Sequence, residues 1–264
     1  MLTRVSGIPV LNYHGIGTLG IPEDVPDRKF WIAAATFRQQ LAQIRYSGRR
    51  VVLLPEHWGR TPARPRGGSS VVITFDDGRL SDYDVAFQLL AQAGARAEFF
   101  INTANIGRPG FMTWAHVEEM QRGGMSFQSH SHDHIVLLGL ARPRLEYQLR
   151  TSKQRLEDRL GRAVQFVAAP YGLLDRHMIE CAEQVGYQGV CNSRQWLAQP
   201  DHRVINRVAV HAHTTGTQFN GLVTARPAAY LPGYGRMALT QVPKRVLLKL
   251  RPSLLGVALA PEGA

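Results

Sequence analysis

Short apolar runs alternate with amphipathic helical patterns along most of the chain. The strand-like runs are rich in β-branched and aromatic residues, and they lie at Pro9–Tyr13, Val51–Leu54, Val71–Phe75, Ala97–Ile101, Met125–Ser129, Val164–Ala169, Gly189–Cys191 and Val204–Val210. The run Val71–Phe75 is almost wholly apolar, which is typical of a strand covered on both faces. Buried strands that alternate with helices predict an α/β fold with a parallel sheet.

Helices are predicted between these runs from apolar residues three and four positions apart. Thr36, followed by Gln39, has the pattern of a helix cap, and Gly48 marks the end of that helix. The other predicted helices lie at Asp84–Ala93, Thr113–Arg122, Pro143–Leu160 and Asp175–Val185. Seven or eight strand–helix units, with no glycine-rich dinucleotide fingerprint after the first strand, favour a distorted (β/α) barrel of about seven strands over a doubly wound sheet.

Length and composition restrict the class of protein further. The chain has 264 residues, which is enough for one large domain or two small ones. It has no run of about 18 apolar residues and no charged start followed by an apolar segment, so we expect a cytoplasmic protein that contacts the inner membrane at most peripherally. Two cysteines, Cys181 and Cys191, are too few for a disulfide framework, and we expect buried free thiols in a reducing compartment.

The chain is strongly basic, with 31 Lys and Arg against 20 Asp and Glu and a net charge of +11. It lacks the aromatic–basic interleaving, helix-turn-helix pattern and zinc-finger spacing of nucleic-acid-binding domains, so we expect no nucleic-acid partner. No obligate protein partner is evident. We divide the chain into a barrel domain at 1–225 and a basic, weakly amphipathic tail at 226–264. The tail could contact an anionic membrane or pack on the barrel.

Three short motifs follow predicted strands, at the end where α/β barrels gather catalytic groups. Thr74–Gly78 (TFDDG) contains two adjacent carboxylates, Asp76 and Asp77, which repel each other and should have a cationic neighbour. Alone, this motif is equally consistent with a turn and a helix cap. The segment His130–His134 (HSHDH) would place its first and last imidazoles on one side of a helical turn, with His132 pointing away. Two imidazoles and one carboxylate form a ligand set that leaves positions open on a catalytic metal.

The third motif is Ala168–Gly172 (AAPYG). Pro170 has no amide hydrogen, and a turn begins at Tyr171. The Tyr171 backbone N–H could therefore point into a pocket as an oxyanion donor, while the ring forms a wall. By itself, this motif indicates only a turn.

Together, TFDDG and HSHDH in this order resemble the polysaccharide deacetylases of carbohydrate esterase family four, the NodB homology domain, over roughly Pro9–Val223. The resemblance implies a distorted (β/α) barrel, Asp76 as general base, and a divalent metal on Asp77, His130 and His134. The metal is expected to be Zn²⁺, with Co²⁺, Ni²⁺ or Mn²⁺ as alternatives. The implied reaction removes N-acetyl groups from N-acetylhexosamine units of a polysaccharide or glycolipid precursor. The opening Pro9–His14 (PVLNYH) is similar to the subgroup of exopolysaccharide and poly-N-acetylglucosamine deacetylases.

The chain departs from the family pattern at two positions. Many members have Arg two residues before the proline of the third motif, where it holds the base; this chain has Ala168 there. We hypothesise that Arg207 supplies the cation from another direction. The general acid is open between His211, His213 and His14. Substrate contacts are expected at Pro170, Tyr171 and His14.

Two other functions remain open. Relatives of this fold hydrolyse acetyl esters or cyclic amides, and the catalytic motifs do not separate these substrates from N-acetyl sugars. The missing Arg also allows a low-activity glycan-binding module that retains the metal. The presence of Asp76 argues against a pure binding module, because binding alone requires no base.

Overall fold

The computed structural model describes residues 7–18, 27–58, 70–199, 202–233 and 235. Nine strands in this part of the chain form one parallel sheet in the order β10-β9-β8-β7-β6-β5-β1-β11, with β4 paired to β5. The strands are β1 Val10–Tyr13, β4 Arg50–Val51, β5 Ser70–Asp77, β6 Glu98–Ile101, β7 Ser126–Ser129, β8 Phe166–Ala168, β9 Gly189–Cys191, β10 Val204–Ile205 and β11 Val208–Ala209.

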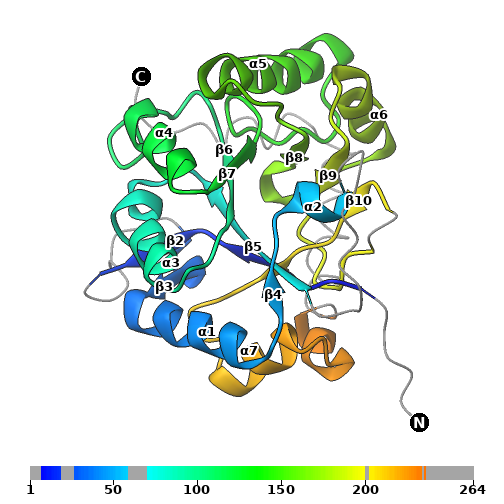
Figure 1. The fold of residues 1–264 in the computed structure, drawn as a ribbon. Helices are drawn as coiled ribbons and strands as arrows, with labels where there is room; N and C mark the ends of the chain where they lie inside the picture. The colour runs from blue at the N-terminus through cyan, green and yellow to red at the C-terminus, as the bar shows by residue number, and fades with distance from the viewer. Residues whose placement is uncertain (1–6, 19–26, 59–69, 200–201, 234, 236–264) are drawn as a thin grey trace.

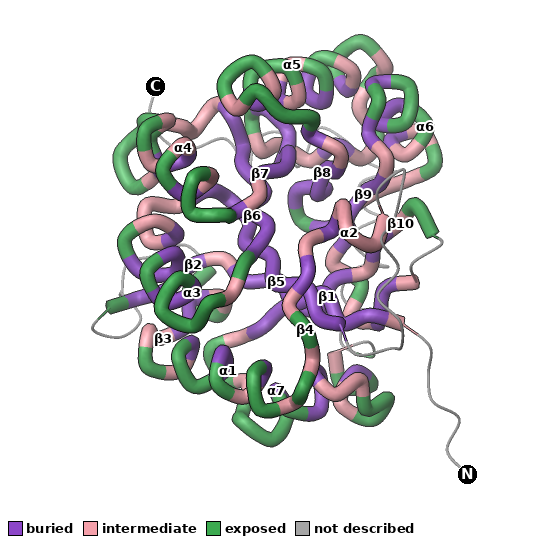
Figure 2. The backbone as a smooth tube through the Cα atoms, in the orientation of Figure 1, coloured by how far each residue is buried: buried purple, intermediate pink, exposed green. Residues whose placement is uncertain are grey.

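Helices surround this sheet (Figure 1). They are α1 Ala34–Tyr46, α2 Leu54–Trp58, α3 Gln88–Gln92, α4 Trp114–Arg122, α5 Arg142–Leu160, α6 Arg176–Val185 and α7 Gly216–Val223, with a π-helix, η2, at Asp82–Phe87 before α3. Buried segments gather on the strands, while the outward sides of the helices are exposed (Figure 2). The architecture is the α/β fold that the alternating pattern predicts.

The barrel has a seam where its hydrogen bonding is interrupted. The two edges of the sheet are β10 and β11, which the sequence pattern placed in a single strand at 204–210. β10 pairs with β9 and β11 pairs with β1, so the two residues between them, Asn206 and Arg207, cross the seam. A single straight strand could not pair with both β9 and β1, and the predicted strand is therefore divided in two.

Alternation along the strands separates an interior cluster from two outer cores. Val10, Val72, Phe100 and Phe166 belong to the interior cluster. The outer cores lie between strands and helices, with Phe75 and Phe99 in one and Val167 in another. Successive residues of a strand point to opposite sides, so each strand contributes to both an outer core and the interior.

The element bounds differ from the predictions at several places. Helix α1 begins at Ala34 directly after β3 (Trp31–Ala33), and Ala33 precedes it without a side-chain cap, so the predicted cap at Thr36 is wrong. Only the start of the strand predicted at 51–54 is extended, because Leu54 already begins α2. A short ladder that the pattern did not indicate pairs β2 (Gly15–Gly17) with β3. The expected loop at 61–69 lies outside the described residues.

The predicted tail begins inside the folded domain. Residues 227–233 are helical, and Tyr230 is buried, donating a hydrogen bond from its hydroxyl to the Leu222 carbonyl at 2.6 Å. Its ring also packs against Trp196. Residues 236–264 lie outside the described part. Within the described part, no helix is both long and apolar enough to cross a membrane. The two cysteines, Cys181 and Cys191, are buried and unpaired, as expected.

Candidate active site

The three sequence motifs meet at one edge of the sheet. Asp76 and Asp77 are the last residues of β5, and His130 follows β7 directly. The third motif follows β8, where Pro170–Gly172 forms a 3₁₀ turn. The strands β5, β6, β7 and β8 are parallel neighbours, so their carboxyl ends lie together.

Asp77, His130 and His134 form a compact group of metal-ligand type. The Asp77 Oδ1 atom lies 3.2 Å from Nε2 of His134 and 3.7 Å from Nε2 of His130, and one ligand atom from each residue lies within 4.8 Å of the others. Donor atoms bound tetrahedrally at about 2 Å from Zn²⁺ are about 3.3 Å apart. The Nδ1 atom of His130 lies 3.0 Å from the Ala168 carbonyl, which leaves Nε2 toward Asp77. The residues present therefore fit a divalent cation.

The electrostatics of the group agree with this role. Burial opposes charge on Asp77, but a hydrogen bond and the charge of His134, together with His14 and Arg79, hold the pKa of this carboxyl well below its ordinary value. Burial lowers the pKa of His130 to about 4. The structure thus presents an ionised carboxylate and a neutral imidazole at neutral pH, which are the forms that bind metals.

The two histidines do not meet through a helical turn. The segment from 130 to 134 is irregular, and Ser131 and His134 have positive φ angles of 66° and 58°. These two left-handed residues turn the chain so that the His130 and His134 rings lie 4.9 Å apart between centroids. His132 points away, as expected, and its Nδ1 lies 2.8 Å from the Thr103 hydroxyl.

Asp76 and Arg207 form a buried bidentate ion pair. Nη1 and Nη2 of Arg207 donate to Oδ1 and Oδ2 of Asp76 at 2.6 and 2.7 Å. Nδ2 of Asn12 donates to Oδ2 at 3.0 Å. Burial favours the protonated acid, but the charge and hydrogen bonds of Arg207 outweigh it and lower the pKa of Asp76 to about 2. The cation that the sequence suggested for Asp76 is in contact with it.

Arg207 is itself enclosed on every side. Its side chain is fully buried, its Nε donates to the Asn192 carbonyl at 3.1 Å, and its guanidinium lies 5.0 Å from the centre of the Phe100 ring. Ala168, the residue at which many relatives have Arg, lies in the same interior cluster as Phe100. The guanidinium therefore reaches Asp76 from the seam of the barrel.

The sequence pattern did not indicate the polar residues that complete this pair. Thr74 donates its hydroxyl hydrogen to the Leu11 carbonyl at 2.9 Å, and Asn12 contacts both Thr74 and Asp76. Asn12 lies two residues after Val10 in β1, and Thr74 lies two residues after Val72 in β5. Both therefore point to the same side of the sheet as these interior valines. A polar residue on the inward side of an otherwise apolar strand is the signal that could have found them.

The three acid candidates lie along one aromatic row. Phe30 stacks on His14 at 4.7 Å and on His211 at 5.0 Å, and His213 stacks on His211 at 5.1 Å, all between ring centroids. Burial lowers the pKa of His14, whereas the charges of Asp77 and Asp76 raise it. His14 is therefore within electrostatic reach of both carboxylates.

Tyr171 forms a rim of the site. Its ring lies 5.2 Å from the His134 ring, and 42% of the residue remains exposed, while Pro170 is buried. Six non-glycine residues of the described chain have positive φ, and four of them belong to the three motifs: Asp77, Ser131, His134 and Tyr171. Such conformations cost about 1–3 kcal/mol each and gather at functional sites.

Comparison with known proteins assigns this arrangement to a family. The family model "Polysaccharide deacetylase" matches residues 63–190, which include all three motifs. The chain carries a polysaccharide deacetylase domain. Over 218 residues the deacetylase domain is 25% identical to YxkH of Bacillus subtilis, a protein assigned to the same family, covering 82% of this chain and 76% of YxkH.

Solved deacetylase structures share its fold. The Streptococcus pyogenes deacetylase PplD, determined with acetate, is 23% identical and superposes with a TM-score of 0.76, covering 84% of this chain and 99% of PplD. IcaB from Ammonifex degensii is 25% identical, with a TM-score of 0.69 and coverage of 83% and 97%. The barrel expected from the sequence is therefore of the NodB type, with a seam between β10 and β11.

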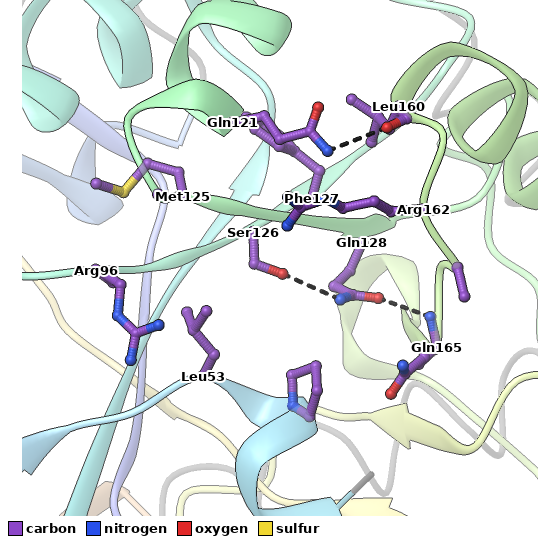
Figure 3. Close-up of a pocket in the computed structure, with 13 residues that line it drawn as sticks. Leu53, Arg96, Gln121, Met125, Ser126, Phe127, Gln128, Leu160, Arg162 and Gln165 are labelled. Atoms are coloured by element: carbon purple, nitrogen blue, oxygen red, sulfur yellow. Dashed lines mark hydrogen bonds between the residues drawn. The ribbon is translucent and has the colours of Figure 1, made fainter. Parts of the chain in front are cut away.

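The deacetylase domain also has a cavity of about 380 Å³ at the opposite, amino end of the strands (Figure 3). Its lining residues are Leu53, Pro55, Arg96, Gln121, Gly124, Met125, Ser126, Phe127, Gln128, Leu160, Arg162, Ala163 and Gln165. Gln128 closes one wall, donating to the Ser126 hydroxyl and accepting from the Gln165 backbone N–H. None of the motif residues lines this cavity.

Proposed function

We propose that the protein is a metal-dependent hydrolase that removes N-acetyl groups from N-acetylhexosamine units of a polysaccharide or glycolipid precursor. The observation that carries this proposal is the metal-ligand group Asp77, His130 and His134 beside the Asp76–Arg207 pair, inside a polysaccharide deacetylase domain. A divalent cation, above all Zn²⁺, would supply polarisation of the acyl carbonyl and a lowered pKa of water.

Asp76 is proposed as the general base. Arg207 keeps its carboxylate ionised and holds its plane, so the group can accept a proton at any pH above about 2. A carboxylate with such a low pKa is a weak base, and it returns the proton readily. An amine product with a pKa near 8 is a far stronger base, so the proton is passed on toward the leaving nitrogen.

His14 is proposed as the group that passes this proton from Asp76 to the nitrogen. An amide releases its amine only after protonation, so the site needs an acid beside the carboxylates. His14 is half-buried and within electrostatic reach of both Asp76 and Asp77. His211 and His213 extend the aromatic row from Phe30, and we assign them to the sugar-binding rim.

The third motif is proposed to receive the acyl oxygen and the sugar. The left-handed conformation of Tyr171 turns its backbone between Pro170 and Gly172, and its N–H is the candidate oxyanion donor. The exposed Tyr171 ring, next to His134, offers a face for a pyranose ring. The opening Pro9–His14, which resembles the exopolysaccharide deacetylase subgroup, supports an exopolysaccharide as the polymer.

The first experiment measures acetate release from N-acetylglucosamine oligomers by Zn²⁺-loaded protein. Asp76→Asn is the control that should keep the metal and lose the base. We expect the wild type to release acetate and Asp76→Asn to release none. Removal of the metal from the wild type should abolish acetate release, and restoring the metal should recover it. Release only from acetylated xylan would indicate an esterase. Metal binding without any release from either substrate would indicate a glycan-binding module.

A further inference from the structure

The two oxygens of Asp77 have different neighbours. Oδ1 faces Nε2 of His130 and of His134, whereas Oδ2 accepts a hydrogen bond from Nη2 of Arg79 at 2.9 Å. We propose that Arg79 is a positioning residue that fixes the Asp77 carboxylate for cation binding. This inference rests on the proposed metal site. It adds a residue to which neither the motifs nor the comparisons assign a role.

The guanidinium of Arg79 packs against the face of the Trp31 ring. Its guanidinium lies 5.6 Å from the centre of the Trp31 ring, and Trp31 is nearly buried in β3. Cation–π contact of this kind holds the guanidinium over the face of the ring. The Arg79 side chain is 19% exposed, so it is largely withdrawn from solvent at the point where it meets Asp77.

The β2–β3 ladder places Trp31 in this position. Gly15 pairs with Trp31, and a Cβ built on Gly15 would lie 2.4–2.7 Å from three atoms of the indole ring. Only glycine leaves room for the ring at this position. A side chain at 15 would displace Trp31 from under Arg79.

A second carboxyl group lies near Arg79. Asp82 is fully buried at the start of η2, and burial raises its pKa well above the ordinary value, whereas the charge of Arg79 lowers it. Because burial favours the uncharged form of Asp82, the ion pair that orients Arg79 is the one with Asp77.

Arg79 could affect cation binding in two opposite ways. Its positive charge repels a nearby cation, which by itself weakens binding. Its hydrogen bond fixes the terminal torsion of the carboxylate, which is otherwise broad, and turns Oδ1 toward the imidazoles. Since Arg79 contacts the oxygen that faces away from the histidines, it does not occupy the cation position. We expect orientation to outweigh repulsion.

The test compares Zn²⁺ affinity of the wild type and Arg79→Met by competition with a chromogenic chelator, together with the visible spectrum of the Co²⁺-loaded proteins. We expect Arg79→Met to bind Zn²⁺ about 10–100-fold more weakly and to change the Co²⁺ spectrum, because outer partners of metal ligands typically contribute this much. Arg96→Met, which removes an arginine paired with Glu56 at the other end of the barrel, is the matched control and should change neither.

Equal or tighter Zn²⁺ binding by Arg79→Met would overturn the inference. Asp77→Asn separates this result from failure of the metal site itself: if Asp77→Asn loses the metal while Arg79→Met keeps it, only the role of Arg79 falls. If Asp77→Asn also keeps full affinity, the proposed site is wrong. Should Arg79→Met not fold by circular dichroism, Arg79→Gln, whose shorter amide does not reach Oδ2, provides the same comparison.

Discussion

Arg207 and Asp76 are 131 positions apart in the sequence, and their side chains form two parallel hydrogen bonds of 2.6 and 2.7 Å in the barrel interior. Arg207 crosses the seam between β10 and β11, while Asp76 ends β5. Paired hydrogen bonds of this geometry fix the plane of the carboxylate as well as its charge. The Arg207 guanidinium thus enters the barrel interior at the seam and takes the place of the arginine that the third motif lacks.

Replacing Arg207 should remove both activity and stability. Arg207→Ala leaves a buried carboxylate without its partner, which typically costs about 3–5 kcal/mol of unfolding free energy. The pKa of Asp76 should rise, because the largest effect that opposes burial is then removed. We expect turnover to collapse while bound metal, measured by elemental analysis, is retained. The double variant Arg207→Ala with Asp76→Asn should regain part of the stability, and near wild-type turnover in Arg207→Ala would contradict the assignment.

The free energy of unfolding of the metal-free protein should decrease in two separate pH ranges as the pH is lowered. His130 has a pKa of about 4 in the fold against an ordinary 6.5, so the unfolded chain binds its proton first and stability falls from about pH 6.5 to about 4. Asp76, at about 2 against 3.8, contributes stability above about pH 4 that is lost as pH falls to about 2. The two losses are about 3 and about 2 kcal/mol.

Urea unfolding of metal-free wild type, His130→Asn and Asp76→Asn at pH values from 7 to 2.5 checks these windows. His130→Asn should reduce the loss in the upper window, to which His14 also contributes, and Asp76→Asn should reduce the loss in the lower one, to which Asp77 also contributes. A free energy of unfolding that stays constant between pH 6.5 and 4 in the wild type would refute the account of His130.

Among the histidines of the aromatic row, His14 should matter most for turnover. A positioned proton donor contributes about 10²–10⁴-fold, so His14→Asn should lower kcat by about 100-fold or more. His211→Asn and His213→Asn should act mainly on KM, since we place them at the rim. Steady-state kinetics on the same oligomer decide this, and a larger loss of kcat in His211→Asn than in His14→Asn would transfer the acid role.

Gly15→Ala should destabilise the fold through Trp31. The added methyl would meet the indole ring at 2.4–2.7 Å, and overpacking of this kind costs about 1–3 kcal/mol. Because Trp31 supports Arg79, Zn²⁺ affinity should fall as well. Gly235→Ala, where a Cβ meets no atom within 4 Å, is the control. Unchanged unfolding and affinity in Gly15→Ala would show that the ring moves freely.

Much of the architecture and the core of the site follow from the sequence for a local reason. Apolar runs bounded by polar residues encode buried strands, and the carboxyl ends of parallel strands meet at one edge. Asp77 ends such a run and His130 follows one directly, so the pattern alone brings these two residues together. Their grouping required no knowledge of long-range side-chain contacts.

Tertiary structure decided what depends on register and closure. The strand predicted at 204–210 is interrupted because its first part pairs with β9 and its second part pairs with β1. Only this geometry shows how Arg207 reaches Asp76. The left-handed turns at Ser131 and His134, rather than a helical turn, bring the imidazoles together. The support of Arg79 by Trp31 depends on the β2–β3 ladder, for which the hydrophobic pattern carries no signal. Periodicity records which residues are buried, whereas the partner of a buried charge is fixed only when the barrel is assembled.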